Sequence, residues 1–101
     1  MARVRICFHP FGTMRNLFKR PKVQVEMEEG RTVRYLIDLL AINFHPDIKV
    51  SLIDPQSEGL RQGVFLFLDG INLEDAEGLA TELRDGQEVV VLRGDVAGGA
   101  E

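Results

Sequence analysis

The sequence predicts an α+β fold in which a mixed sheet of about five strands packs on one main helix. Two observations carry this prediction. Apolar and polar residues alternate in 3–9 and 22–28, and one central segment has apolar residues at helical spacing. The expected order is strand, strand, helix, strand, strand, short helical turn, strand. We expect the first and last strands to lie adjacent and parallel at the centre of the sheet, with a hairpin on each side.

Two alternating segments, 3–9 and 22–28, predict an N-terminal hairpin. Each places apolar side chains on one face and polar side chains on the other, which is the period of a half-buried strand. Pro10, Gly12 and Pro21 indicate turns between them, so the connection is long. The apolar positions are Val4, Ile6 and Phe8 in the first segment and Val23, Val25 and Met27 in the second.

The main helix is predicted to begin after Thr32, a suitable N-cap. Pro46 ends it, because proline lacks the amide that a helix needs and disfavours helical geometry in the preceding residue. The apolar face of this helix is expected to comprise Val33, Leu36, Ile37, Leu40 and Phe44.

The stretch 45–63 has the least regular pattern in the chain. We expect it to lie on the surface, with Val50, Leu52 and Ile53 as an apolar anchor before the turn-like Asp54-Pro55.

The C-terminal half begins with a continuous apolar run, 64–68, typical of a strand. Asp69-Gly70 then predicts a two-residue hairpin turn, and 71–73 a short returning strand. In 77–83 a single helical turn is expected, with Leu79 and Leu83 on one side.

The last strand is predicted at 88–92, which is rich in valine as strands prefer. We therefore expect one domain over residues 1–93. Residues 94–101 are expected to form a flexible tail, since three of them are glycine and they show no amphipathic pattern.

At 101 residues the chain has room for one domain and one core. Its net charge of -4 and pI near 5.2 argue against a general affinity for nucleic acid, which requires clustered cations. A local basic run nevertheless follows the first strand and has two interpretations, a solvated loop or a docking patch for an acidic partner. It comprises Arg15, Lys19, Arg20 and Lys22.

A single cysteine, Cys7, excludes an internal disulfide, and no stretch resembles a signal sequence, so we expect a cytoplasmic protein. No apolar run approaches the roughly 20 residues that a membrane span requires. Cys7 itself has two interpretations: a persulfide or thioester site, or a small, partly buried strand residue.

Conventional catalytic patterns are absent from the sequence. His9 and His45 lie in unlike segments, and the aspartates lack the spacing of a calcium loop, so no metal site is predicted. We find no nucleophile paired with a base and no phosphate loop. The chain is expected to act through another protein rather than as an enzyme.

The two apolar strands, 64–68 and 88–92, suggest an interaction surface. If Leu66, Leu68, Val89 and Val91 face the helix, the alternate side chains project outward and mark a protein interface. In the alternative interpretation, the loop 45–63 folds back and covers them. The outward residues are Phe65, Phe67, Val90 and Leu92.

Several segments together resemble the MoaD and ThiS family of sulfur carriers, which have the ubiquitin-like β-grasp fold. The stretch 77–92, followed by 96–99, resembles the C-terminal signature of that family. Residues 8–12, 30–33 and 67–70 correspond to its first strand and loop, its helix start and its central hairpin. The resemblance extends over almost the whole chain.

The resemblance implies a protein co-substrate whose reacting group is the carboxylate of Gly99. An adenylating enzyme of the MoeB or ThiF type would activate it with ATP, and the product would become a thiocarboxylate. A synthase would then take the sulfur to build molybdopterin, a thiazole or a related product. Gly98 and Gly99 keep the tail thin enough to enter another enzyme, since glycine has no Cβ. No cofactor would be bound by the carrier itself.

Two features depart from the family pattern. Ala100 and Glu101 follow Gly99, so its carboxyl group is held in a peptide bond. Either a protease removes them, as a zinc metalloprotease does for some such carriers, or the protein has left the carrier function. The tail is also one residue longer than usual, with Arg93-Gly94-Asp95 where many members have prolines. The rival hypothesis is a non-covalent β-grasp interaction subunit, or a ubiquitin-like modifier, bound to a larger enzyme.

Overall fold

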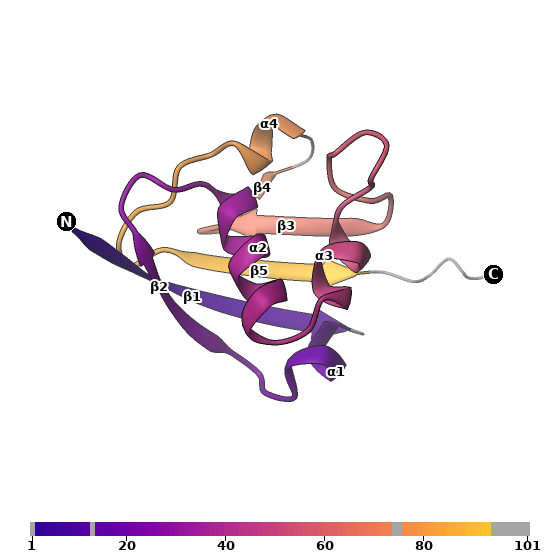
Figure 1. Ribbon diagram of the computed structural model, residues 1–101, viewed down its shortest axis with the longest axis horizontal. Helices are drawn as coiled ribbons and strands as arrows, with labels where there is room; N and C mark the ends of the chain where they lie inside the picture. The colour runs from indigo at the N-terminus through magenta and orange to yellow at the C-terminus, as the bar shows by residue number, and fades with distance from the viewer. Residues whose placement is uncertain (1, 13, 74–75, 94–101) are drawn as a thin grey trace.

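The computed structural model describes residues 2–12, 14–73 and 76–93 (Figure 1). These residues form one five-stranded sheet with helices against one of its faces. The expected tail 94–101, with Gly98 and Gly99, lies outside the described residues, and the domain boundary after residue 93 stays a prediction.

The sheet has the order β2-β1-β5-β3-β4. The central strands β1 (Arg3–Gly12) and β5 (Glu88–Arg93) are parallel, as predicted. Strand β2 (Val23–Glu28) pairs antiparallel with β1, and β3 (Val64–Leu68) pairs antiparallel with β5 and with β4 (Ile71–Leu73). A mixed sheet with its first and last strands at the centre confirms the predicted β-grasp fold.

The helix α2 (Val33–Asn43) lies across the sheet (Figure 1). Thr32 caps it as predicted, since its hydroxyl accepts a hydrogen bond of 3.4 Å from the amide of Tyr35. Phe44 is the C-cap and keeps 36% of its surface exposed. Four predicted residues of the apolar face are buried, namely Val33, Leu36, Ile37 and Leu40.

The turn between β3 and β4 takes the predicted two-residue form. Asp69 and Gly70 both have positive φ, 49° and 86°, which is the backbone that Asp-Gly favours in such hairpins. Asp69 Oδ1 also accepts a hydrogen bond of 2.9 Å from the amide of Glu88. The hairpin is thereby tied to the start of β5.

The prediction that 45–63 lies on the surface is wrong in part. It contains the helix α3 (Asp47–Leu52), in which Ile48 and Leu52 are fully buried, and Ile53 is 7% exposed. Val50, predicted as an anchor, is instead 61% exposed. A six-residue helix shows only two inward positions, so its periodicity is too short to distinguish from a loop in sequence.

The prediction for the connection between the first two strands is also wrong in part. It contains α1 (Met14–Phe18), where only turns were expected. Phe18 is 4% exposed, and its ring centroid lies 5.2 Å from those of both Phe8 and Phe44. These aromatic contacts, distant in sequence, hold a single helical turn that has little stability by itself.

The expected helical turn in 77–83 is shorter than predicted. The helix α4 (Ala76–Leu79) ends at Leu79, and the chain then runs beside the start of α2, where the amide of Leu83 donates to the carbonyl of Arg31 at 2.9 Å. Leu79 and Leu83 nevertheless both reach the core and are fully buried. Within the part of the chain that the structure describes, no helix has the length and apolar character to cross a membrane.

Candidate functional site

The face of the sheet that points away from α2 carries an apolar row at one end. Register places Leu92 of β5 between Phe11 of β1 and Phe65 of β3. Each of these three side chains keeps a large exposed fraction, 41% for Phe11 and Leu92 and 45% for Phe65. The residues directly before and after them in each strand point to the opposite face of the sheet.

A second row lies one step further along the same face. Val90 pairs with His9 on one side and with Phe67 on the other, and all three are half-buried. We call the five apolar residues of the two rows the apolar patch. It comprises Phe11, Phe65, Phe67, Val90 and Leu92.

The structure thus brings together the four residues predicted for the interaction surface. The alternative, in which 45–63 covers them, does not occur, because Ile48 and Leu52 of α3 pack into the core on the opposite face. A role of these residues in partner binding stays a prediction.

Phe11 was missed because the first strand was predicted to end at residue 9. Pro10 and Gly12 looked like turn residues, yet β1 continues to Gly12 and pairs with β5 up to Arg93. The parity of the strand contained the signal: residues 4, 6 and 8 point inward, so residue 11 continues the outward set.

The apolar patch lies where the C-terminal segment leaves the sheet. Phe11 and Gly12 pair with Leu92 and Arg93, the last two residues of β5. In the sequence, six residues separate this point from Ala100, and the last two of the six are Gly98 and Gly99. Their chemical role lies outside the described residues and stays a prediction.

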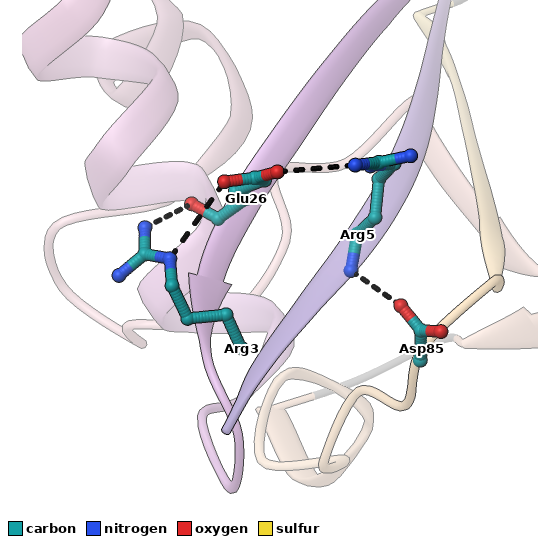
Figure 2. Close-up of polar contacts among 4 residues, drawn as sticks. All are labelled: Arg3, Arg5, Glu26 and Asp85. Atoms are coloured by element: carbon teal, nitrogen blue, oxygen red, sulfur yellow. Dashed lines mark hydrogen bonds and ion pairs between the residues drawn. The ribbon is translucent and has the colours of Figure 1, made fainter. Parts of the chain in front are cut away.

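The opposite end of the same face is polar and contains ion pairs between its two strands (Figure 2). Glu26 lies between two arginines, with Oε1 3.8 Å from Arg3 Nε and Oε2 3.3 Å from Arg5 Nη2. The amide of Arg5 donates to Asp85 Oδ1 at 2.8 Å. These residues line a shallow groove of about 580 Å³. Lys22, which also lines the groove, has no ion pair with a described residue.

Cys7, His9 and Glu88 lie between the two ends. Cys7 is half-buried, which agrees with a small strand residue. His9 Nε2 lies 3.6 Å from Glu88 Oε1 and is buried without a hydrogen-bond partner among the described residues. His45 belongs to the loop between α2 and α3, where its Nδ1 accepts from the amide of Asp47. The structure does not bring the two histidines together, and the described residues contain no metal-binding cluster.

The model of the ThiS family matches residues 10–99, which is most of the chain and includes the end of β1, the whole remaining sheet and the Gly98-Gly99 pair. The chain belongs to the ThiS family. The match stops at Gly99, so Ala100 and Glu101 lie beyond the part that the family shares. No curated protein sequence matches the chain.

Solved structures of similar fold support this assignment. A putative molybdopterin converting factor subunit 1 from Pyrococcus furiosus is 25% identical, with a TM-score of 0.71, over 89% of this chain and 97% of the other. A chain of the Amycolatopsis orientalis BexX/CysO complex is 26% identical, with a TM-score of 0.69, over 93% and 99%.

A third structure, small archaeal modifier protein 1 from Methanosarcina acetivorans, is 23% identical with a TM-score of 0.73, over 98% of this chain and all of the other. It shares the fold. ThiS-type proteins are small carriers and not enzymes themselves.

Proposed function

We propose that this ThiS-family protein is a sulfur carrier whose Gly99 carboxylate is adenylated and then thiocarboxylated. The observation that carries the proposal is the family match, which covers most of the β-grasp domain and ends at the Gly98-Gly99 pair. The position of the apolar patch at the end of β5 supports it, because a partner that holds the patch would have the tail beside its own active site.

The proposed chemistry needs two steps. A Gly99 carboxylate oxygen attacks the α-phosphorus of ATP, so that an acyl-phosphate bond forms and pyrophosphate leaves. A sulfide equivalent supplied by a partner then attacks the carbonyl carbon, and a carbon–sulfur bond replaces the carbon–oxygen bond as AMP leaves. The carrier supplies only the carboxylate, and the partner supplies ATP, metal and the donors that stabilise the developing charge.

This chemistry requires removal of Ala100 and Glu101, since a carboxyl group in a peptide bond cannot be adenylated. We propose that a metalloprotease trims these two residues. The end of the family match at Gly99 supports a functional boundary at that position.

The proposed partners are an adenylating enzyme of the MoeB or ThiF type and a synthase that accepts the sulfur. The similarity to a molybdopterin converting factor subunit and to a chain of the BexX/CysO complex supports a role with partner enzymes. Molybdopterin, thiamine or a related cofactor would receive the sulfur, and the reactions would take place in the cytoplasm.

A second candidate is a non-covalent interaction subunit or a ubiquitin-like modifier. The apolar patch supports it independently of the tail. Phe11, Leu92 and Phe65 lie in one row and are each at least 41% exposed, and such a row of large apolar side chains is typical of a protein interface. The likeness to a small archaeal modifier protein agrees with this candidate.

Mass spectrometry of the protein from its native cells tests the proposal. A species that ends at Gly99, together with one in which sulfur has replaced one terminal oxygen, is the expected result. If only the intact chain to Glu101 occurs while the cofactor pathway is active, the carrier function is excluded. Deletion of residues 98–101 separates the carrier from a non-covalent interaction subunit, since the subunit keeps its function and a carrier or a ubiquitin-like modifier loses it.

A further inference from the structure

Charge is distributed unevenly along the chain. All 16 acidic residues lie after residue 25, whereas six of the 12 basic residues lie before it. Lys and Arg of this first quarter therefore have no acidic neighbours in sequence and must find any carboxylate partner through the fold.

Two of these six cations do find one. Arg3 and Arg5 share Glu26 across the β1–β2 ladder, as described for the polar groove (Figure 2). The other four have no ion pair with a described residue and are all exposed. We call these four residues the basic segment. It comprises Arg15, Lys19, Arg20 and Lys22.

Cations elsewhere in the described chain mostly have partners. Arg31 pairs with Glu28 at 2.9 Å and Lys49 with Asp38 at 2.9 Å. Arg34 and Arg61 donate to backbone carbonyls. Arg84 resembles the basic segment in having no side-chain partner among the described residues, but it stands alone, next to Asp85 at the polar end. The basic segment is therefore the one concentration of unneutralised positive charge in the described part of the chain.

The basic segment borders the apolar patch. The guanidinium carbon of Arg15 lies 5.8 Å from the centroid of the Phe11 ring, so the cation covers the edge of the patch. Helix α1, which carries Arg15, lies at the end of β1 where β5 also ends (Figure 1). Lys22 immediately precedes Val23, which pairs with Phe8.

We propose that the apolar patch and the basic segment form one docking surface for a protein partner whose own surface is acidic around an apolar centre. This inference rests on the proposed function, in which that partner is the adenylating enzyme. The apolar residues provide the buried centre of the interface, and the unpaired cations attract the partner and set its orientation. The attraction brings the partner to the end of the sheet from which the tail departs.

The chemistry of the surface favours a protein over a nucleic acid. The chain as a whole carries a net charge of -4, which repels a polyphosphate beyond the basic segment. The flanking side chains Phe11, Phe65 and Leu92 belong to paired strands of a sheet and form a continuous apolar surface, the usual centre of a protein interface with a charged rim.

Stopped-flow binding to the purified adenylating enzyme of the source organism tests this surface. The full chain is compared with a K19Q/R20Q/K22Q variant and with a control variant, R34Q/K49Q/R84Q, that loses the same charge elsewhere. We expect the association rate of the first variant to fall at least about tenfold at low ionic strength, and its salt dependence to flatten. The control should lose less than about twofold, the remaining long-range effect of net charge.

Equal losses in the two variants, or an association rate of the full chain that does not depend on salt, would overturn the inference. So would specific binding of a short RNA duplex that the first variant loses. Release of pyrophosphate from ATP, the product of adenylation, is measured in parallel with the chain that ends at Gly99. Binding that depends on the basic segment without adenylation leaves the docking surface standing and rejects the carrier chemistry. If adenylation occurs but the association rate falls equally in the two variants, the carrier chemistry stands and the docking surface is rejected.

Discussion

Phe11 and Leu92 are paired neighbours in the parallel β1–β5 ladder, one near the end of the first strand and the other near the end of the last. Both side chains lie on the face that the helices leave uncovered, and each keeps 41% of its surface exposed. The pairing places two exposed apolar side chains next to Arg93, the last residue of β5. Under the proposed function, the partner would therefore dock at the end of the sheet from which the tail continues.

The apolar patch is tested by the substitution Phe65→Ser. Phe65 is 45% exposed, so its loss should change the free energy of unfolding by less than about 1 kcal/mol. Affinity for the adenylating enzyme should fall at least about tenfold, because a large aromatic side chain near the centre of an interface contributes strongly. Calorimetric titration and thermal unfolding measure the two effects.

Ile42→Ser provides the matched control for this substitution. Ile42 is 78% exposed on α2, the opposite side of the sheet, and its loss should leave the affinity unchanged. Equal affinity losses in both variants would contradict the assignment of the surface.

The core position of α3 is tested by comparing Ile48→Ala with Val50→Ala. Ile48 is fully buried and Val50 is 61% exposed, although they lie two residues apart in one helix. The first change should lower the free energy of unfolding by about 2–5 kcal/mol through lost burial and a cavity, and the second by less than about 0.5 kcal/mol. Urea denaturation gives both values. Similar midpoints for the two variants would mean that α3 is not part of the core.

Gly78 is constrained by space rather than by its backbone angles. A Cβ at this position would lie 2.8 Å from the Cβ and 3.3 Å from the Cα of Leu73. Gly78→Ala should therefore destabilise the protein by about 1–3 kcal/mol, the usual cost of overpacking. The exposed neighbour Ala80 supplies the control as Ala80→Ser. If Gly78→Ala unfolds at the same temperature as the wild type, α4 can move away from β4 without loss of stability.

The two terminal glycines are tested in a chain that ends at Gly99. We expect Gly98→Val to abolish thiocarboxylate formation, because a branched side chain would not pass through a narrow active-site channel. Gly94→Ala, earlier in the tail, should retain it. Intact-protein mass spectrometry after incubation with the adenylating enzyme, ATP and a sulfide source distinguishes the two. Full thiocarboxylation of the valine variant would remove the steric reason for the glycine pair.

Alternation and turn chemistry were sufficient to predict most of the fold. Strand parity places Ile6 and Leu66 in the core and Phe65 outside, Asp69-Gly70 adopts the predicted hairpin turn, and Thr32 caps the main helix. In these cases the local sequence and the final environment agree, so a short-range rule is enough.

The elements that were missed depend on contacts between distant residues. Phe18 is buried only because Phe8 and Phe44 meet it, and Ile48 only because α3 lies beside α2. A helix of five or six residues contains too few positions to show its period, and its stability comes from tertiary packing. Phe11 also depends on a contact distant in sequence, since its strand continues through Pro10 and stays paired with β5 up to Gly12.

For the candidate site, sequence predicted the outward set Phe65, Phe67, Val90 and Leu92 but not the residue that completes it. It also left two interpretations of the basic run open. Ion pairing in the fold separates Arg3 and Arg5, which share Glu26, from the cations that follow Phe11. Such partners across strands cannot be assigned from spacing along a single chain.

The central position of β5 has a mechanical consequence. This strand is hydrogen-bonded on both sides, to β1 and to β3, with bonds that run across the strand direction. Tension applied through the C-terminus along the axis of β5 loads these bonds together in shear, instead of opening them one at a time. A carrier built this way can have its end drawn deep into another protein while the rest of the molecule stays folded.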